Sequence, residues 1–108
     1  MPKFSRDKGA RGEREFAHFL IDAGFDASRG YFEDGSKDIH CPDLPDVHFE
    51  VKRRENWDIH KWIKQANDDA GADKIPVVAA KRNRGEWIAI LPMADLLNLL
   101  ETWYEDAR

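Results

Sequence analysis

Apolar and polar residues alternate in two short stretches near the middle of the chain. Residues 47–52 place Val, Phe and Val at every other position, with polar residues between them. Residues 38–41 alternate in the same way. A period of two is typical of a strand with one buried face. The pattern therefore predicts two strands on either side of a turn that contains Pro42 and Pro45.

If these strands pair as an antiparallel hairpin centred near Leu44, Asp38 lies opposite Glu50. Both carboxylates then share the polar face with Lys52 and with two histidines, His40 and His48. Two carboxylates and an ammonium group a few ångströms apart suit a divalent metal that takes oxygen ligands. An ordinary solvent-facing strand is the alternative, because Glu-x-Lys triplets are common.

Apolar residues near the start of the chain follow helical spacing. The pattern predicts a first helix that ends at Gly24, with the apolar stripe Phe16, Phe19, Leu20 and Ala23. Two residues are candidate N-caps: Ser5 and Asp7. Glu13 lies at the edge of the stripe, on a helix predicted to cover the sheet, so it is expected to reach the site. Gly9 and Gly12 fall on the same side and allow another backbone or a DNA strand to approach closely.

The remaining elements follow from the same rules. They are a strand at 25–31, a helix at 56–70 capped by Asn56 or Asp58, strands at 75–80 and 87–91, and a helix from Pro92. The continuous apolar run 75–80 predicts a strand buried on both faces. Together these elements predict an α/β protein with a mixed central β-sheet of about four to five strands flanked by helices, in a single domain over residues 1–108.

The last helix carries more apolar residues than one stripe needs. Five keep helical spacing: Met93, Leu96, Leu97, Leu100 and Tyr104. Two more, Leu99 and Trp103, lie outside that stripe. The surplus indicates either a wide core face or a second contact surface, such as a dimer interface.

Composition and charge narrow the class of protein. With 42% hydrophobic and 35% charged residues, no apolar run near the roughly 20 residues of a membrane span, and no signal-peptide core, we expect a cytoplasmic protein without a membrane segment. The only cysteine, Cys41, is expected to be buried. The net charge is −4, but basic residues cluster at 1–14, 52–54 and 81–84. Such a polarised chain can bind a phosphate backbone with one face, although scattered solubilising charges fit the composition as well.

The Pro42-Asp43 dipeptide offers a different metal-binding aspartate. Asp43 lies inside the predicted turn, too close in sequence to Glu50 to face it across two strands. Asp38 is therefore the predicted ligand, and Asp43 and Asp46 are predicted turn residues. The two histidines of the polar face lack a third ligand at metal spacing, so zinc is disfavoured.

The segment 35–38 followed by Glu50-Val51-Lys52 resembles the catalytic core of the PD-(D/E)xK nucleases. Residues 8–14 resemble the first helix of the Holliday-junction resolvases in that superfamily. Residues 75–78 and 82–87 are similar to phage-encoded resolvase-like members. The resemblance implies a restriction-endonuclease-like core and, for a phage protein, a place in the cytoplasm of the bacterial host.

The resemblance also implies metal-dependent cleavage of DNA. The ion, Mg²⁺ or Mn²⁺, would be bound by Asp38, Glu50 and the Val51 carbonyl, and Glu13 would bind a second ion directly or through water. Lys52 would orient the nucleophile or offset charge in the transition state, and Gln65 would lie near the scissile phosphate. DNA contacts are expected from Lys8, Arg11, Arg14, Ser36, Arg53 and Arg54.

Junction resolvases act on four-way DNA as homodimers, so the implied partners are DNA and a second copy of the chain. A related nuclease could instead act on flap, single-stranded or duplex DNA. A restriction-type nicking enzyme would need a recognition segment for which this length leaves no room. A non-catalytic DNA-binding module with a nuclease fold is a further alternative, which the intact Asp38, Glu50 and Lys52 disfavour.

Overall fold

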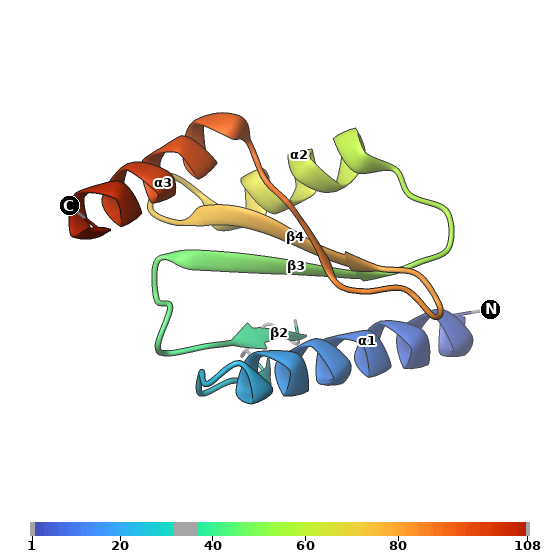
Figure 1. Ribbon diagram of the computed structural model, residues 1–108. Coiled ribbons are helices and arrows are strands. Elements are labelled where there is room, and N and C mark those ends of the chain that lie inside the picture. Colours follow the sequence, from blue (N-terminus) through green and yellow to red (C-terminus); the bar gives the residue numbers. More distant parts are fainter. Residues whose placement is uncertain (1, 32–36, 108) are drawn as a thin grey trace.

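The computed structural model describes the backbone of residues 2–31 and 37–107, and the side chains of residues 9–30 and 39–107. Within these ranges it has three helices, α1 (Pro2–Asp22), α2 (Ile59–Ala70) and α3 (Met93–Ala107). It has five strands: β1 (Ser28–Tyr31), β2 (Lys37–His40), β3 (Val47–Arg53), β4 (Ile75–Lys81) and β5 (Ile88–Ile90). The predicted α/β class is confirmed (Figure 1).

A three-stranded mixed sheet in the order β3-β4-β5 forms the centre of the fold. β3 and β4 run parallel in a register from Val47 opposite Ile75 to Arg53 opposite Lys81, and β5 returns antiparallel to β4. α2 connects the two parallel strands, as a crossover between parallel strands requires. α1 and α2 lie on opposite sides of β3 and β4 (Figure 1). The prediction that 75–80 is buried on both faces is confirmed, since the middle of β4 is buried throughout.

The predicted hairpin between residues 38–41 and 47–52 is wrong. β2 pairs antiparallel with β1, with Asp38 opposite Gly30, while the described part of β3 pairs with β4. The five described strands therefore form two sheets, not one. Two successive backbone turns, Leu44 N–H to Cys41 O and Val47 N–H to Leu44 O, separate β2 from β3. A connection built from successive turns does not fold the two strands back into one ladder, unlike a tight two-residue loop.

Helix ends follow the capping signals in part. α1 begins at Pro2, so neither predicted N-cap residue starts it. It ends before Gly24 as predicted; Gly24 has φ +103° and donates its N–H to Ile21 O at 2.9 Å. α2 begins at Ile59, three residues later than predicted, after the cap Asp58, whose side chain accepts the Lys61 N–H.

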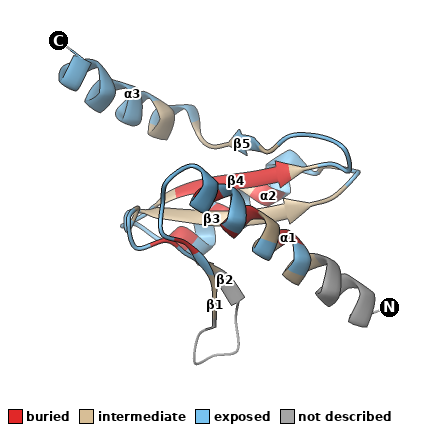
Figure 2. Ribbon diagram, turned by 60° about the horizontal axis from the view of Figure 1, so that its bottom comes forward, coloured by how far each residue is buried: buried red, intermediate tan, exposed pale blue. Residues whose placement is uncertain are grey.

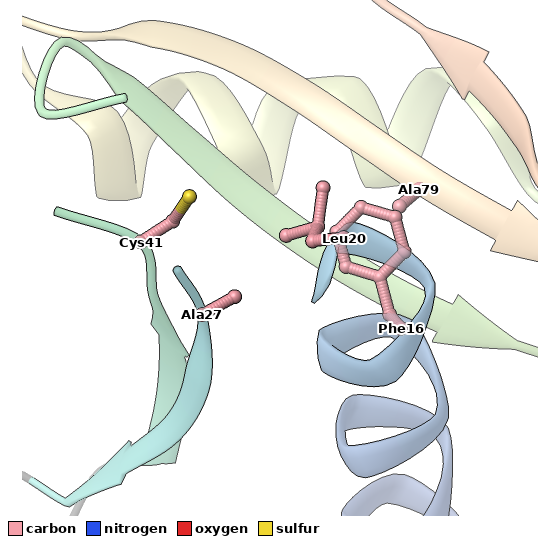
Figure 3. Close-up of a cluster of buried hydrophobic side chains, with 5 residues drawn as sticks. All are labelled: Phe16, Leu20, Ala27, Cys41 and Ala79. Carbon is pink, nitrogen blue, oxygen red and sulfur yellow. The ribbon is translucent and has the colours of Figure 1, made fainter. Parts of the chain in front are cut away.

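Two apolar clusters lie on the two sides of the central sheet. Figure 3 shows the first, where Phe16 and Leu20 of α1 meet Ala79 of β4, with Ala27 and Cys41 beside them. The second cluster lies under α2 and contains Trp62, Ala66, Val78 and Ala80. The predicted burial of Cys41 is confirmed, because 9% of the residue is exposed.

α3 buries none of its residues. Figure 2 shows it extending away from the central sheet, with most of its length exposed. Met93 and Trp103 are each 66% exposed, so the core-face interpretation of this helix is wrong. The physical reason is that α1 and α2 already cover the faces of β3 and β4. None of the described helices is both long and apolar enough to cross a membrane.

Candidate functional site

Alternation along β3 sends its side chains to two different helices. Phe49 packs against Phe16 of α1 with ring centroids 5.1 Å apart, and Val51 lies close to Gly12 of the same helix. Lys52, on the other face, donates a hydrogen bond from Nζ to Gln65 Oε1 of α2 at 2.9 Å. Because successive side chains of a strand point to opposite faces, Glu50 also faces α2.

Glu50 is held between two positively polarised partners. Its Oε2 lies 3.3 Å from His48 Nε2, and its Oε1 lies 3.7 Å from Lys52 Nζ. Burial acts to raise the pKa of Glu50, but the His48 hydrogen bond and the Lys52 charge outweigh it and lower that pKa below its ordinary value. Glu50 therefore stays ionised at neutral pH.

Asp69 of α2 completes a small cluster with His48 and Glu50. One ligand atom from each of the three residues lies within 4.8 Å of the others. Burial and the neighbouring Glu50 charge raise the pKa of Asp69. Carboxylate and imidazole groups converging at this distance suit a divalent cation, which would relieve the repulsion between the two acids. The donor set thus fits the metal that the sequence predicts.

An open pocket of about 620 Å³ lies beside this cluster, between the edge of β3 and α2. Four of its lining residues are basic: Lys52, Arg54, Lys61 and Lys64. Trp62 forms part of the wall, with the Lys52 ammonium 6.0 Å from its ring centroid. Sequence reasoning missed Lys61, Lys64 and Asp69. The sequence contained a signal for two of them. Lys61 and Asp69 are each four residues from Gln65 on the predicted helix 56–70, and residues four apart share a helix face.

The structure brings three of the predicted catalytic residues together: Glu50, Lys52 and Gln65. Asp38 has its backbone in β2, but its side chain lies outside the described residues. The Lys8 side chain and all of Ser36 also lie outside them.

Glu13 lies apart from Glu50, Lys52 and Gln65. It accepts a hydrogen bond from Arg29 of β1 at 3.3 Å, and the adjacent Gly12 lies against Arg53 and Val51. α1 therefore presents this region to the face of β3 opposite the one that carries Glu50. In the described structure Glu13 is not part of the cluster formed by His48, Glu50 and Asp69.

The predicted DNA-binding arginines differ in their surroundings. Arg11 and Arg14 are exposed on α1. Arg53 is held by Glu15 at 3.1 Å and by Asn83 at 2.7 Å, so it ties β3 to α1 and to the loop after β4. Arg54 lines the pocket beside Lys52.

Of the three residues set aside as metal ligands in the sequence analysis, His48 forms part of the cluster with Glu50 and Asp69, whereas Asp43 and His40 do not. Asp43 lies in the turn region after β2 and accepts the Asp26 N–H on Oδ2 at 2.7 Å, which joins two loops. His40 is exposed at the end of β2 and does not join the cluster of His48, Glu50 and Asp69.

Glu50 and Lys52 lie two residues apart on β3, and Gln65 lies on the next helix, an arrangement typical of a PD-(D/E)xK nuclease core within an α/β fold. The chain belongs to the family described as "Phage putative PDDEXK endonuclease", whose model matches residues 4–107. Members of this nuclease class generally use divalent metals, in keeping with the acidic cluster around Glu50. No curated protein and no solved structure matches the chain.

Proposed function

We propose that the protein is a metal-dependent DNA endonuclease that hydrolyses phosphodiester bonds, and specifically a resolvase of four-way DNA junctions. The observation that carries the nuclease function is the contact of Lys52 with both Glu50 and Gln65, beside a pocket with four basic residues. Family membership supports the same activity.

Within this proposal, Glu50, the Val51 carbonyl and Asp38 would hold Mg²⁺ or Mn²⁺, which would supply an activated water and charge neutralisation at the phosphate. Glu13 is left outside this set because it pairs with Arg29 on the α1 side of β3. Lys52 keeps its ammonium next to Glu50, where it offsets negative charge that develops on the phosphate oxygens. Gln65 accepts a hydrogen bond from Lys52 and so fixes the direction of that ammonium.

The basic pocket supports DNA as the substrate. Lys61 and Lys64 of α2 and Arg54 after β3 line the same pocket as Lys52, and these four cations outnumber the two acidic lining residues, Asp68 and Asp69. Phosphate contacts of this kind position a strand without reading its sequence. A structure-selective nuclease needs this type of contact, and its affinity falls steeply with salt.

The resolvase part of the proposal requires two active sites and therefore a second copy of the chain. α3 offers a contact surface, because large apolar side chains lie exposed along it: Met93, Leu97, Leu99, Leu100, Trp103 and Tyr104. Exposed apolar patches of this kind mark interaction sites in soluble proteins. A homodimer through α3 would bring two cleavage sites into one assembly, as the proposed resolvase activity requires.

The test is cleavage of labelled four-way, flap and linear duplex DNA with and without Mg²⁺. We expect cutting of the four-way substrate in Mg²⁺ only, and we expect Glu50→Gln and Asp38→Asn to abolish cutting while DNA binding remains. Asp43→Asn is the matched control and should leave both intact. Preference for flap or duplex DNA would replace the resolvase part with a related nuclease. Binding without cutting of any substrate would favour a DNA-binding module.

A further inference from the structure

α2 and the polar face of β3 meet in two matched contacts. Gln65 contacts Lys52, and Asp69, one helical turn further, lies against Glu50, two positions earlier on the strand. Residues four apart on a helix share a face, as do residues two apart on a strand. The way in which α2 packs on β3 therefore positions both contacts, and it holds Asp69 next to Glu50.

Asp69 and Glu50 bring two carboxyl groups to one place, an arrangement that a bound divalent cation would stabilise. The Asp69 carboxyl group lies close to the partly buried Glu50 carboxylate, and like charges repel. Lys64 does not relieve this repulsion directly, because its ammonium pairs with Asp68 at 2.8 Å. His48 adds a ring nitrogen to the same point, 3.3 Å from Glu50. The three donors converge on one place from two elements.

We propose that Asp69 is a metal ligand supplied by α2, and that it holds the divalent cation of the active site together with Glu50 and His48. The inference rests on the proposed function, because it adds to the ligands of the same site. Glu50 would be the shared ligand, and His48 would offer its ring nitrogen to the cation in the neutral form.

The geometry needs only a small adjustment. Two ligand atoms at roughly 2.1 Å from one Mg²⁺ ion are at most about 4.2 Å apart, and the three ligand atoms of this cluster lie within 4.8 Å of one another. Asp69 is exposed and lies in the last turn of α2, which ends at Ala70. This exposed side chain can change rotamer without movement of the sheet.

The ligand set also predicts metal preference. Carboxylates alone suit Mg²⁺, whereas an imidazole nitrogen favours transition metals such as Mn²⁺. His48 should therefore make the site bind Mn²⁺ more tightly than Mg²⁺. His48→Gln should reduce this preference for Mn²⁺, with a smaller effect on Mg²⁺ binding. An equal loss for both ions, or no loss, would remove His48 from the ligand set.

Calorimetric titration of the purified protein with MnCl₂ tests Asp69 directly, without reference to cleavage. We expect Asp69→Asn to weaken Mn²⁺ binding about tenfold or more. Asp68→Asn is the matched control, because it removes the same charge from the neighbouring residue, whose carboxylate pairs with Lys64. This variant should change the affinity less than twofold. Circular dichroism checks that each variant is folded.

The outcomes separate this inference from the proposed function. If Asp69→Asn binds Mn²⁺ like the wild type while Glu50→Gln does not, Asp69 is not a ligand and the nuclease proposal stands. If Asp68→Asn and Asp69→Asn weaken binding equally, the effect is one of general charge and the inference is also wrong. If the wild type neither binds Mn²⁺ nor cleaves DNA, the proposed function itself fails.

Discussion

Gly12 is the point at which α1 comes closest to β3, and replacing it tests this packing. A Cβ atom at Gly12 would lie 2.8 Å from Arg53 Cβ and 3.7 Å from Val51 Cγ1. Arg53 Cβ is attached directly to the strand backbone, and the guanidinium is held by Glu15 and Asn83. Gly12→Ala therefore forces α1 and β3 apart, because the side chain in its path cannot rotate away.

Two opposing effects set the magnitude. Replacing a glycine inside a helix by alanine gains about 1 kcal/mol of helix propensity. Inserting a methyl group into a packed contact costs about 1–3 kcal/mol. Gly12→Ala should therefore lower the free energy of unfolding by up to about 2 kcal/mol. Gly9 is the matched control, since nothing lies within 4 Å of its Cβ position, and Gly9→Ala should stabilise by up to about 1 kcal/mol.

Urea unfolding followed by tryptophan fluorescence measures both variants. The midpoints should move in opposite directions at an unchanged slope, and the gap between the two variants isolates the packing term. Below its transition, Gly12→Ala should keep any cleavage activity, because Glu50 and Lys52 face α2 and not α1. Equal stabilisation by both alanines would show that α1 does not pack against β3 at Gly12.

Two further predictions concern charge and assembly. The Lys81 and Arg53 partners outweigh the effect of burial and lower the pKa of Glu15. The Glu15 carboxylate thus contributes about 1 kcal/mol or less to stability above its unfolded-state pKa, and this contribution is lost as the pH falls through the lower folded value. Glu15→Gln should therefore reduce stability in urea at pH 7 and have a smaller effect at pH 3. Trp103→Glu on α3 should convert the proposed dimer to a monomer in light scattering, while Asn98→Glu, which adds the same charge, should not; a monomeric wild type contradicts the dimer.

Local patterns determined much of this protein. The alternation of β3 correctly placed Glu50 and Lys52 on one face, because side-chain direction in a strand depends only on position parity. The apolar run of β4 correctly indicated burial on both faces, and Gly24 correctly ended α1. Each of these properties is decided by residues next to one another in the chain.

Only the tertiary structure decided which elements became partners. The alternation of apolar and polar residues in β2 predicts that the strand has one apolar and one polar face. It does not predict that β2 pairs with β1 instead of β3, because strand pairing depends on the path of the connecting turns. Spacing around Gln65 could not place Asp69 against Glu50, because that contact depends on how α2 docks on the sheet. The apolar stripe of α3 was visible in the sequence, yet its exposure follows from α1 and α2 having already covered the core.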